Sequence, residues 1–265
     1  MPKLIKGVRS PRGHEDELAE MTTYMVEQIA KKFRNQAILG LQQGTVKKFA
    51  DKQVGNYASV FTGLAKDVSK KSVKQFDNKR IKAFVGKTLE KVNKRSQKTF
   101  YGRAEQSMGI SQKKLIQKEG LKPTTNALIT ETEMWVKKLR DETIQYFTAN
   151  TLRAMTLGQS VDTILSDFDD MVETRKNQAK FVAQNQIQNF NSLTTNIRAK
   201  NVGVTKAVWR TTGDEKVRPS HADRDGKTFD LAEGCYSSID GEYLLPAVAP
   251  NCRCYCDYVL EDEEE

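Results

Sequence analysis

The chain has 265 residues, of which 38% are hydrophobic, 29% charged and 8% aromatic. This length suits one large domain or two ordinary ones, and the apolar content excludes wholesale disorder. The formal net charge is +9, but residues 1–122 carry +16, residues 123–200 are neutral, and residues 201–265 carry −7. Because such asymmetry favours a polyanionic partner for the basic part, we expect any such contact within the first 122 residues.

Several classes of protein are disfavoured by missing signals. No segment approaches the ~20 apolar residues of a membrane span, and the first residues lack the apolar core of a secretory signal. We therefore expect a protein without membrane association that is made and kept in a cytoplasm. The motifs GxxxxGK[ST], GxGxxG, HExxH and GxSxG are absent, which removes the common nucleotide-binding and hydrolase signatures.

Helical periodicity covers most of the chain. Residues 1–13 lack periodicity and predict a flexible basic arm, whereas apolar residues recur every three or four positions over 14–202. We expect helices to begin near Glu15, after Asn78 and near Thr124. Gly158 should end the third helix, and Ser160 should cap a further stretch of one or two helices that ends near residue 201.

From residue 203 the pattern changes to the alternation of β-strands, which is visible around Trp209 and again from Cys254 to Leu260. Gly213-Asp214 predicts a turn, and Asp225-Gly226 and Asp240-Gly241 predict hairpin-like turns. The fold class is thus α+β, with an elongated, mostly helical body (14–202, basic to about 122 and neutral after it). A small β-rich module (203–260) and an acidic tail (261–265) follow.

The densest basic stretch, from Lys66 to Lys98, contains twelve basic residues against three acidic ones. Lysines outnumber arginines ten to two, which favours contact with phosphates over reading of base edges. A solvated helix face explains the same composition, so both interpretations stay open. The candidate DNA-binding residues are Lys70, Lys71, Lys74, Lys79, Arg80, Lys82, Lys87, Lys91, Lys94 and Arg95.

All four cysteines lie in the C-terminal module, which in a reducing compartment indicates free thiols or a metal site. The candidate zinc ligands are His221, Cys235, Cys252 and Cys254. The C-x-C spacing is unusual for zinc, but alternate residues of a strand share a face, so Cys256 could converge with the others.

Two alternatives to a zinc site remain at this stage. Buried free cysteines could accompany a His221 that is hydrogen-bonded to Asp225. A Cys/His or zinc-dependent enzyme acting on nucleic acid or protein could instead use a cysteine nucleophile, His221 as base and Asp225 as its orienting partner. The zinc-deaminase signature H-x-E…P-C-x-x-C is matched only in part.

The order of the module's residues resembles the C-terminal domain of the Mu F-like minor head proteins (head morphogenesis proteins) of tailed phages. The resemblance covers about 203–258, and it depends on Trp209, Asp214, Arg218, His221, Asp225, Gly226, Asn251, Cys252, Arg253 and Cys254. It implies a minor capsid protein in the virion or procapsid, present in the host cytoplasm during assembly. Its partners would be the portal protein, the major capsid or scaffolding protein and double-stranded DNA.

The resemblance also implies a role in assembly rather than catalysis, so we expect no catalytic residue and, unless zinc binds, no cofactor. We favour a polar network that pins the loops of the module. Its members would be Arg218, His221, Asp225, Asn251 and Arg253.

Overall fold

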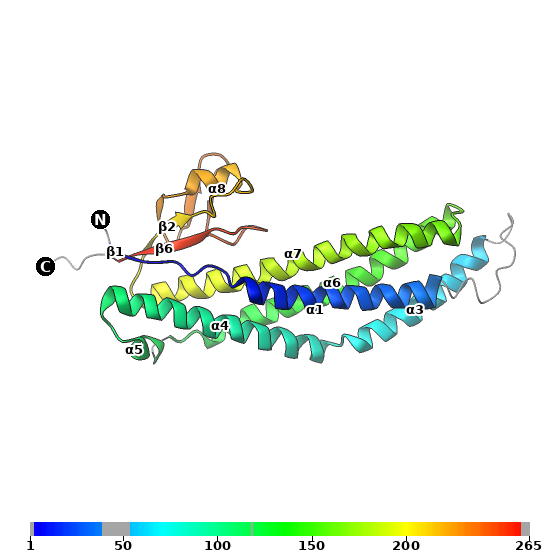
Figure 1. Ribbon diagram of the computed structural model, residues 1–265, viewed down its shortest axis with the longest axis horizontal. Helices are drawn as coiled ribbons and strands as arrows, with labels where there is room; N and C mark the ends of the chain where they lie inside the picture. Colours follow the sequence, from blue (N-terminus) through cyan, green and yellow to red (C-terminus); the bar gives the residue numbers. More distant parts are fainter. Residues whose placement is uncertain (1–2, 39–53, 118, 261–265) are drawn as a thin grey trace. The chain divides into compact units, whose positions relative to one another are not determined.

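The computed structural model describes residues 3–38, 54–117 and 119–260 (Figure 1). Helices dominate the chain and most strands lie near its C-terminus, which confirms the α+β class. The chain divides into two compact units. The first unit comprises residues 1–16, 86–131 and 184–265, and the second comprises residues 17–85 and 132–183. Neither unit is a continuous stretch of chain, in contrast to the expected sequence of body and module.

The helices begin close to where the apolar periodicity places them. They are α1 (Arg12–Lys32), the π-helical segment η1 (Phe33–Ile38), α3 (Val54–Gln75), α4 (Asn78–Met108), α5 (Gln112–Gln117), α6 (Lys122–Thr156) and α7 (Val161–Asn201). The last of these is a single helix, and the Ser160 hydroxyl accepts a hydrogen bond from the Thr163 amide at 3.1 Å, which confirms the predicted cap. Helices α3 and α5 were not expected.

The second unit is held together by aromatic side chains on facing helices. Phe33, Phe147 and Phe168 are buried, and their ring centroids are 5.7 Å apart for the first pair and 4.8 Å for the second. The Thr22 hydroxyl on α1 donates to the Ala179 carbonyl on α7 at 3.2 Å. The apolar stripe of α1 therefore faces the core of this unit, as its periodicity predicts.

The first unit contains a four-stranded antiparallel sheet and a separate hairpin. The sheet has the order β1 (Lys3–Ile5), β6 (Tyr255–Leu260), β2 (Lys206–Arg210) and β3 (Thr228–Asp230). The hairpin pairs β4 (Cys235–Ser237) with β5 (Glu242–Leu244). Asp240-Gly241 forms the turn of this hairpin, with Gly241 at φ +71°, as expected.

One of the predicted turns has a different role. The short helix α8 (Pro219–Arg224), which the sequence did not suggest, lies between β2 and β3 along the chain. Asp225-Gly226 therefore follows a helix instead of joining two hairpin strands, and Gly226 at φ +78° lets the chain turn back toward β3.

The N-terminal segment, expected to be a flexible arm, contains the edge strand β1. Ile5 pairs with Tyr258 of β6 and is fully buried, and the Gly7 amide donates to Asp257 Oδ1 at 2.9 Å. The pairing partner lies about 250 residues away along the chain. No local periodicity could therefore indicate the strand. Residues 1–2 and the predicted acidic tail, 261–265, lie outside the described part of the chain.

The sheet shares its core with helices that precede it in the sequence. Trp209 and Tyr258 belong to one apolar cluster with Phe100 of α4 and Ala199 of α7. The rings of Phe100 and Tyr258 meet edge to face, with centroids 5.6 Å apart. The β-rich module therefore shares one hydrophobic core with segments of α4 and α7, which precede residue 203.

Gly7 makes the closest backbone approach in the sheet. A Cβ atom at this position would lie 1.9 Å from the Cys256 carbonyl oxygen. We predict that Gly7→Ala displaces β1 from β6 and lowers the free energy of unfolding by about 1–3 kcal/mol, as overpacking does elsewhere. Urea unfolding of a Trp135→Phe background, in which the buried Trp209 is the fluorescent reporter, measures this loss.

Gly13→Ala is the matched control. Nothing lies within 4 Å of a Cβ atom at Gly13, which is in the first turn of α1, so this variant should be neutral or slightly stabilising. Equal stability of the two variants would contradict the close approach of Gly7 to β6.

Candidate functional site

Three of the four candidate metal ligands form one buried cluster. His221 Nδ1 lies 3.4 Å from Cys252 Sγ and 3.6 Å from Cys254 Sγ, and all three ligand atoms lie within 4.8 Å of one another. Helix α8 supplies the histidine, and the turn before β6 supplies both cysteines. Each of the three residues is at most 6% exposed, so bulk water does not compete for these donors.

The loop before Cys252 directs a backbone amide at the Cys252 sulphur. Ala247 and Asn251 adopt left-handed backbone conformations with φ of +67° and +58°. Such a conformation is unfavourable for alanine, and here it accompanies a hydrogen bond from the Ala247 amide to Cys252 Sγ at 3.2 Å. A second turn contact, from the Cys252 amide to the Ala249 carbonyl at 3.0 Å, fixes the cysteine backbone.

The two cysteines of the cluster differ in acidity. A hydrogen bond from the Cys254 thiol, together with backbone amides and the charge of His221, lowers the pKa of Cys252 to about 6 despite its burial. The same contact with Cys252, and burial, raise the pKa of Cys254. Cys252 thus has the greater thiolate character of the pair.

The other two cysteines lie apart from this cluster, which corrects the expected ligand set. Cys235 is on β4, away from the three ligand atoms, and burial raises its pKa. Cys256 lies opposite Trp209 in the sheet, and burial raises its pKa too. Because β6 begins only at residue 255, Cys252 and Cys254 precede the strand, and the alternation of strand faces does not bring Cys256 to them.

The expected partnership of His221 with Asp225 is not observed either. Asp225 Oδ1 accepts a hydrogen bond from the Thr211 amide at 2.8 Å, and the His221 ring instead contacts the sulphurs of Cys252 and Cys254 and the Trp209 ring. The carboxylate therefore supports the loop after β2. His221 Nδ1 lies beside the two cysteine sulphurs, without Asp225 as an orienting partner of the ring.

The polar motif residues pin loops through separate contacts instead of one network. Arg253 forms a two-pronged ion pair with Asp214, with both N–O distances at 2.6 Å, and this pair lowers the pKa of Asp214. Arg218 donates to the Pro250 carbonyl, and the Asn251 amide donates to Asn185 Oδ1 at 3.3 Å. The last contact joins the cysteine loop to α7.

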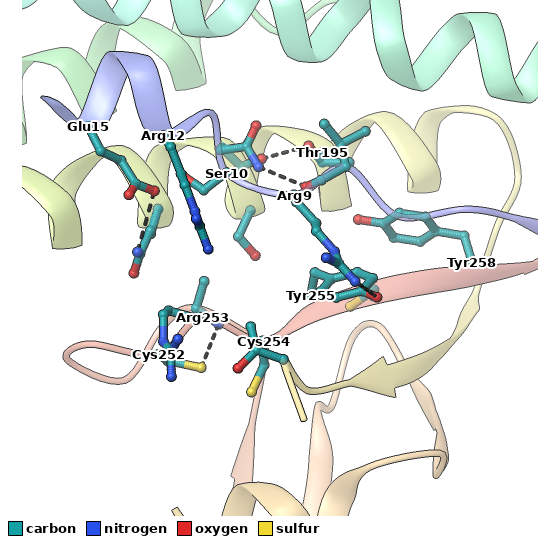
Figure 2. A pocket seen from close by; sticks show the side chains of 17 residues that line it. Arg9, Ser10, Arg12, Glu15, Thr195, Cys252, Arg253, Cys254, Tyr255 and Tyr258 are labelled. Carbon is teal, nitrogen blue, oxygen red and sulfur yellow. Dashed lines mark hydrogen bonds between the residues drawn. The ribbon is translucent and has the colours of Figure 1, made fainter. Parts of the chain in front are cut away.

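Two cavities border the cluster. The larger, of about 490 Å³, is lined by all three cluster residues together with polar side chains such as Gln188 and Thr212. The smaller cavity, of about 110 Å³, is lined by Cys252 and Cys254 and by residues near the start of the chain, among them Arg12 and Glu15. Figure 2 shows Cys252 and Cys254 in the turn before β6, across the cavity from the segment that carries Arg9 and Arg12.

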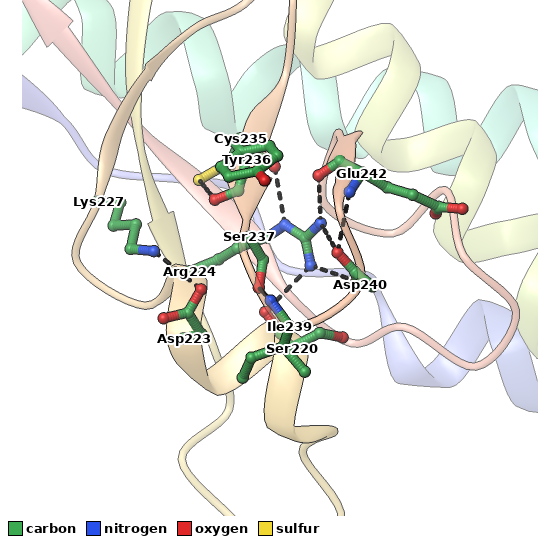
Figure 3. Close-up of polar contacts among 10 residues, drawn as sticks. All are labelled: Ser220, Asp223, Arg224, Lys227, Cys235, Tyr236, Ser237, Ile239, Asp240 and Glu242. Carbon is green, nitrogen blue, oxygen red and sulfur yellow. Dashed lines mark hydrogen bonds and ion pairs between the residues drawn. The ribbon is translucent and has the colours of Figure 1, made fainter.

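Arg224 is a site residue that the sequence analysis missed (Figure 3). Its side chain is fully buried and forms a bidentate ion pair with Asp240 at 2.8 and 2.9 Å. It also donates to the carbonyls of Cys235 and Glu242 at 2.8 and 2.7 Å, and its guanidinium lies 5.5 Å from the Trp209 ring centroid. This cation ties α8, and with it His221, to the β4–β5 hairpin, and it lowers the pKa of Asp240.

The candidate DNA-binding residues lie on two helices, α3 and α4. Phe76 and Asp77 separate α3 from α4. The Asp77 carboxylate caps α4, because its Oδ1 accepts a hydrogen bond from the Arg80 amide at 2.8 Å. The candidates from Lys70 to Lys82 are in the second unit, and those from Lys87 to Arg95 are in the first. All ten are exposed except the half-buried Lys91.

Comparison with known protein families gives a match that includes the cysteine cluster. Residues 145–256 match the model of the family described as Phage Mu protein F like protein. This match confirms the Mu F-like resemblance and supports a phage head morphogenesis protein. It covers less than half of the chain but begins well before residue 203, so it includes all of α7 and the end of α6.

A curated relative and two negative findings complete the comparison. The chain is 29% identical over 140 residues to an uncharacterized protein of Haemophilus influenzae, which covers 53% of this chain but only 30% of that relative. The chain thus spans under a third of the length of this curated relative. No solved structure matches. Within the described residues, no helix combines the length and apolar character that a bilayer crossing requires.

We predict that Arg224→Ala lowers the free energy of unfolding by about 3–5 kcal/mol, because it leaves buried acceptors and a carboxylate without their partner. Urea unfolding followed by Trp209 fluorescence measures this loss directly. Lys227→Met is the control, since the Lys227–Asp223 pair is largely exposed and should cost at most about 1 kcal/mol. Similar losses in both variants would contradict the structural role of Arg224.

Proposed function

We propose that the chain is a structural protein of head morphogenesis in a tailed bacteriophage, located in the virion or procapsid. The Mu F-like match over residues 145–256 is the observation that carries this proposal. The structure supports it because residues 184–256 of the match belong to the first unit, in which the C-terminal part of α7 contacts the β-rich module. Tyr258 of β6 donates to Asn196 Oδ1 on α7 at 2.7 Å, and Ser192 of α7 donates to the Pro246 carbonyl at 2.7 Å.

The surroundings of the cysteine cluster favour assembly over hydrolytic chemistry. None of the described residues that line the 490 Å³ cavity is an aspartate or glutamate, so this cavity lacks the carboxylate that serves a zinc deaminase as general acid and base. Asp223, which follows His221 in the motif, is instead engaged with Lys227 at 2.9 Å. The site thus differs from a zinc deaminase and from a Cys–His–Asp triad, although Cys252 and His221 lie side by side.

The β4–β5 hairpin offers a surface for a protein partner, for which we propose the portal protein. Tyr236 and Tyr243 are 45% and 60% exposed, and their rings lie 5.1 Å apart. Ile239, in the turn between the two strands, is 59% exposed. Exposed aromatic side chains grouped in this way are typical of the centre of a protein interface.

A particle assay tests both the role and the surface. In the phage or prophage that encodes the chain, we predict that purified heads contain the protein. Tyr236→Ser combined with Tyr243→Ser should reduce its amount per head at least tenfold at unchanged expression. Quantitative mass spectrometry of the heads measures both quantities.

Met134→Gln is the control, since Met134 is 64% exposed on α6 and is outside the hairpin. Absence of the wild-type chain from heads would contradict the assembly role. Normal incorporation of the tyrosine variant would contradict the hairpin as the docking surface.

We further propose that the basic faces of α3 and α4 contact packaged double-stranded DNA without sequence preference. Lys70, Lys74, Lys79 and Lys82 are exposed and belong to the same unit. Lysines placed in this way neutralise phosphates and release counterions, a mechanism that needs no contact with bases.

A salt titration with random duplex DNA tests this contact. Changing these four lysines to glutamine should reduce the slope of log K against log salt concentration by about 3–4, since each lost phosphate contact accounts for about 0.9. The control changes Lys113, Lys114, Lys180 and Lys200, four exposed lysines outside the basic stretch, to glutamine. Equal slopes for both variants would assign the effect to net charge alone and contradict a specific basic face.

A further inference from the structure

The cluster of His221, Cys252 and Cys254 has dimensions that suit a metal ion. Zinc bonds of about 2.1 Å to nitrogen and 2.3 Å to sulphur, at tetrahedral angles, place the two donor atoms about 3.6 Å apart. The observed Nδ1–Sγ distances are 3.4 and 3.6 Å. The two nitrogen–sulphur distances therefore match two edges of one tetrahedral site, and all three donor atoms lie within 4.8 Å of one another.

The atoms around the sulphurs fit thiolates better than neutral thiols. The Ala247 amide donates to Cys252 Sγ, and this contact depends on a left-handed backbone conformation at alanine. Trp209 is fully buried, its ring lies 5.5 Å from that of His221, and its indole Nε1 has no hydrogen-bond partner among the described residues. An N–H group that donates to a cysteine sulphur, as the Ala247 amide does, is typical of the outer shell that orients metal-bound cysteines.

We propose that the chain binds one Zn²⁺ through His221 Nδ1, Cys252 Sγ and Cys254 Sγ, with an exchangeable fourth ligand supplied from the 490 Å³ cavity. The donor set of one imidazole and two thiolates is one that zinc prefers. The cavity is lined by all three donors, by neutral polar side chains that could hold a bound water, and by the cations Lys216, Arg218 and Arg253. This proposal is independent of the role in head assembly.

The ion would connect segments that are distant in the sequence. His221 is on α8, whereas the two cysteines lie in the turn that leads into β6. A bond from each to one metal would fix α8 to the last strand of the sheet. Because the unfolded chain does not hold these donors together, binding would stabilise the folded module.

Metal analysis of the full-length chain tests the site. The untagged protein is purified with a phosphine reductant and without chelator, exposed to excess zinc, and freed of unbound metal by gel filtration. We expect one zinc per chain by mass spectrometry of the metal, and a chelator should lower the melting temperature until zinc is restored. Cobalt substitution should give the intense visible bands of a tetrahedral site together with sulphur-to-cobalt charge transfer. Added azide should shift the visible bands by entering the fourth position.

Variants separate the proposed ligands from the other cysteines. Cys252→Ser and Cys254→Ser should each lose stoichiometric zinc, whereas Cys235→Ser and Cys256→Ser, which change equally buried cysteines outside the cluster, should keep one zinc per chain. Circular dichroism confirms that each variant is folded. A reduced, folded wild-type chain that holds no stoichiometric zinc would overturn the proposal, and so would full retention of zinc by the first two variants. Cobalt bands that azide leaves unchanged would overturn the exchangeable fourth position.

Discussion

The strand β6 is the constraint on which the first unit depends. It lies between β1 and β2, so it satisfies the backbone hydrogen bonds of segments from opposite ends of the chain. Asp257, buried on this strand, accepts hydrogen bonds from the Gly7 amide and from Arg210, and these contacts lower its pKa against the effect of its burial. Tyr258 on the same strand contacts α7 through Asn196 and α4 through Phe100. One six-residue strand therefore joins the N-terminus, two long helices and the module that carries the family motif.

The cysteine cluster follows from this arrangement. Cys254 immediately precedes β6, so the sheet fixes its position, and the strained turn from Ala247 to Cys252 is attached to α7 through Asn185. His221 reaches the cluster because Arg224, one turn later on α8, is anchored in the β4–β5 hairpin. A short helix and a loop, neither of them stable alone, are thus held by buried polar contacts. This explains why the motif residues are spread over more than forty positions of the sequence.

The sequence predicted those features that depend on local patterns. Periodic apolar residues located α1, α4, α6 and α7, and the cap at Ser160 was correct. Helix α3 was missed because glycine and lysine residues interrupt its stripe, although Phe61 and Val68 are buried. The strand β1 and the buried role of Arg224 depend on partners that no local pattern reveals. Of the cysteines, Cys235 was wrongly included because composition gives no geometry. The extent of the Mu F-like segment was underestimated because α7 contributes neutral polar residues that form no recognisable motif. Asn196 accepts a hydrogen bond from Tyr258 of the module, and Asn191 donates to the Val8 carbonyl of the N-terminal segment.

The central claim is that β6 holds the N-terminal segment in place, and hydrogen exchange of the native full-length chain tests it most directly. The amides of Ile5 and Gly7 should be protected from exchange and should open together with the amide of Tyr258, because all three belong to one buried set of contacts. Exchange of the Ile5 and Gly7 amides at the rate of an unstructured peptide, with Tyr258 still protected, would contradict the claim.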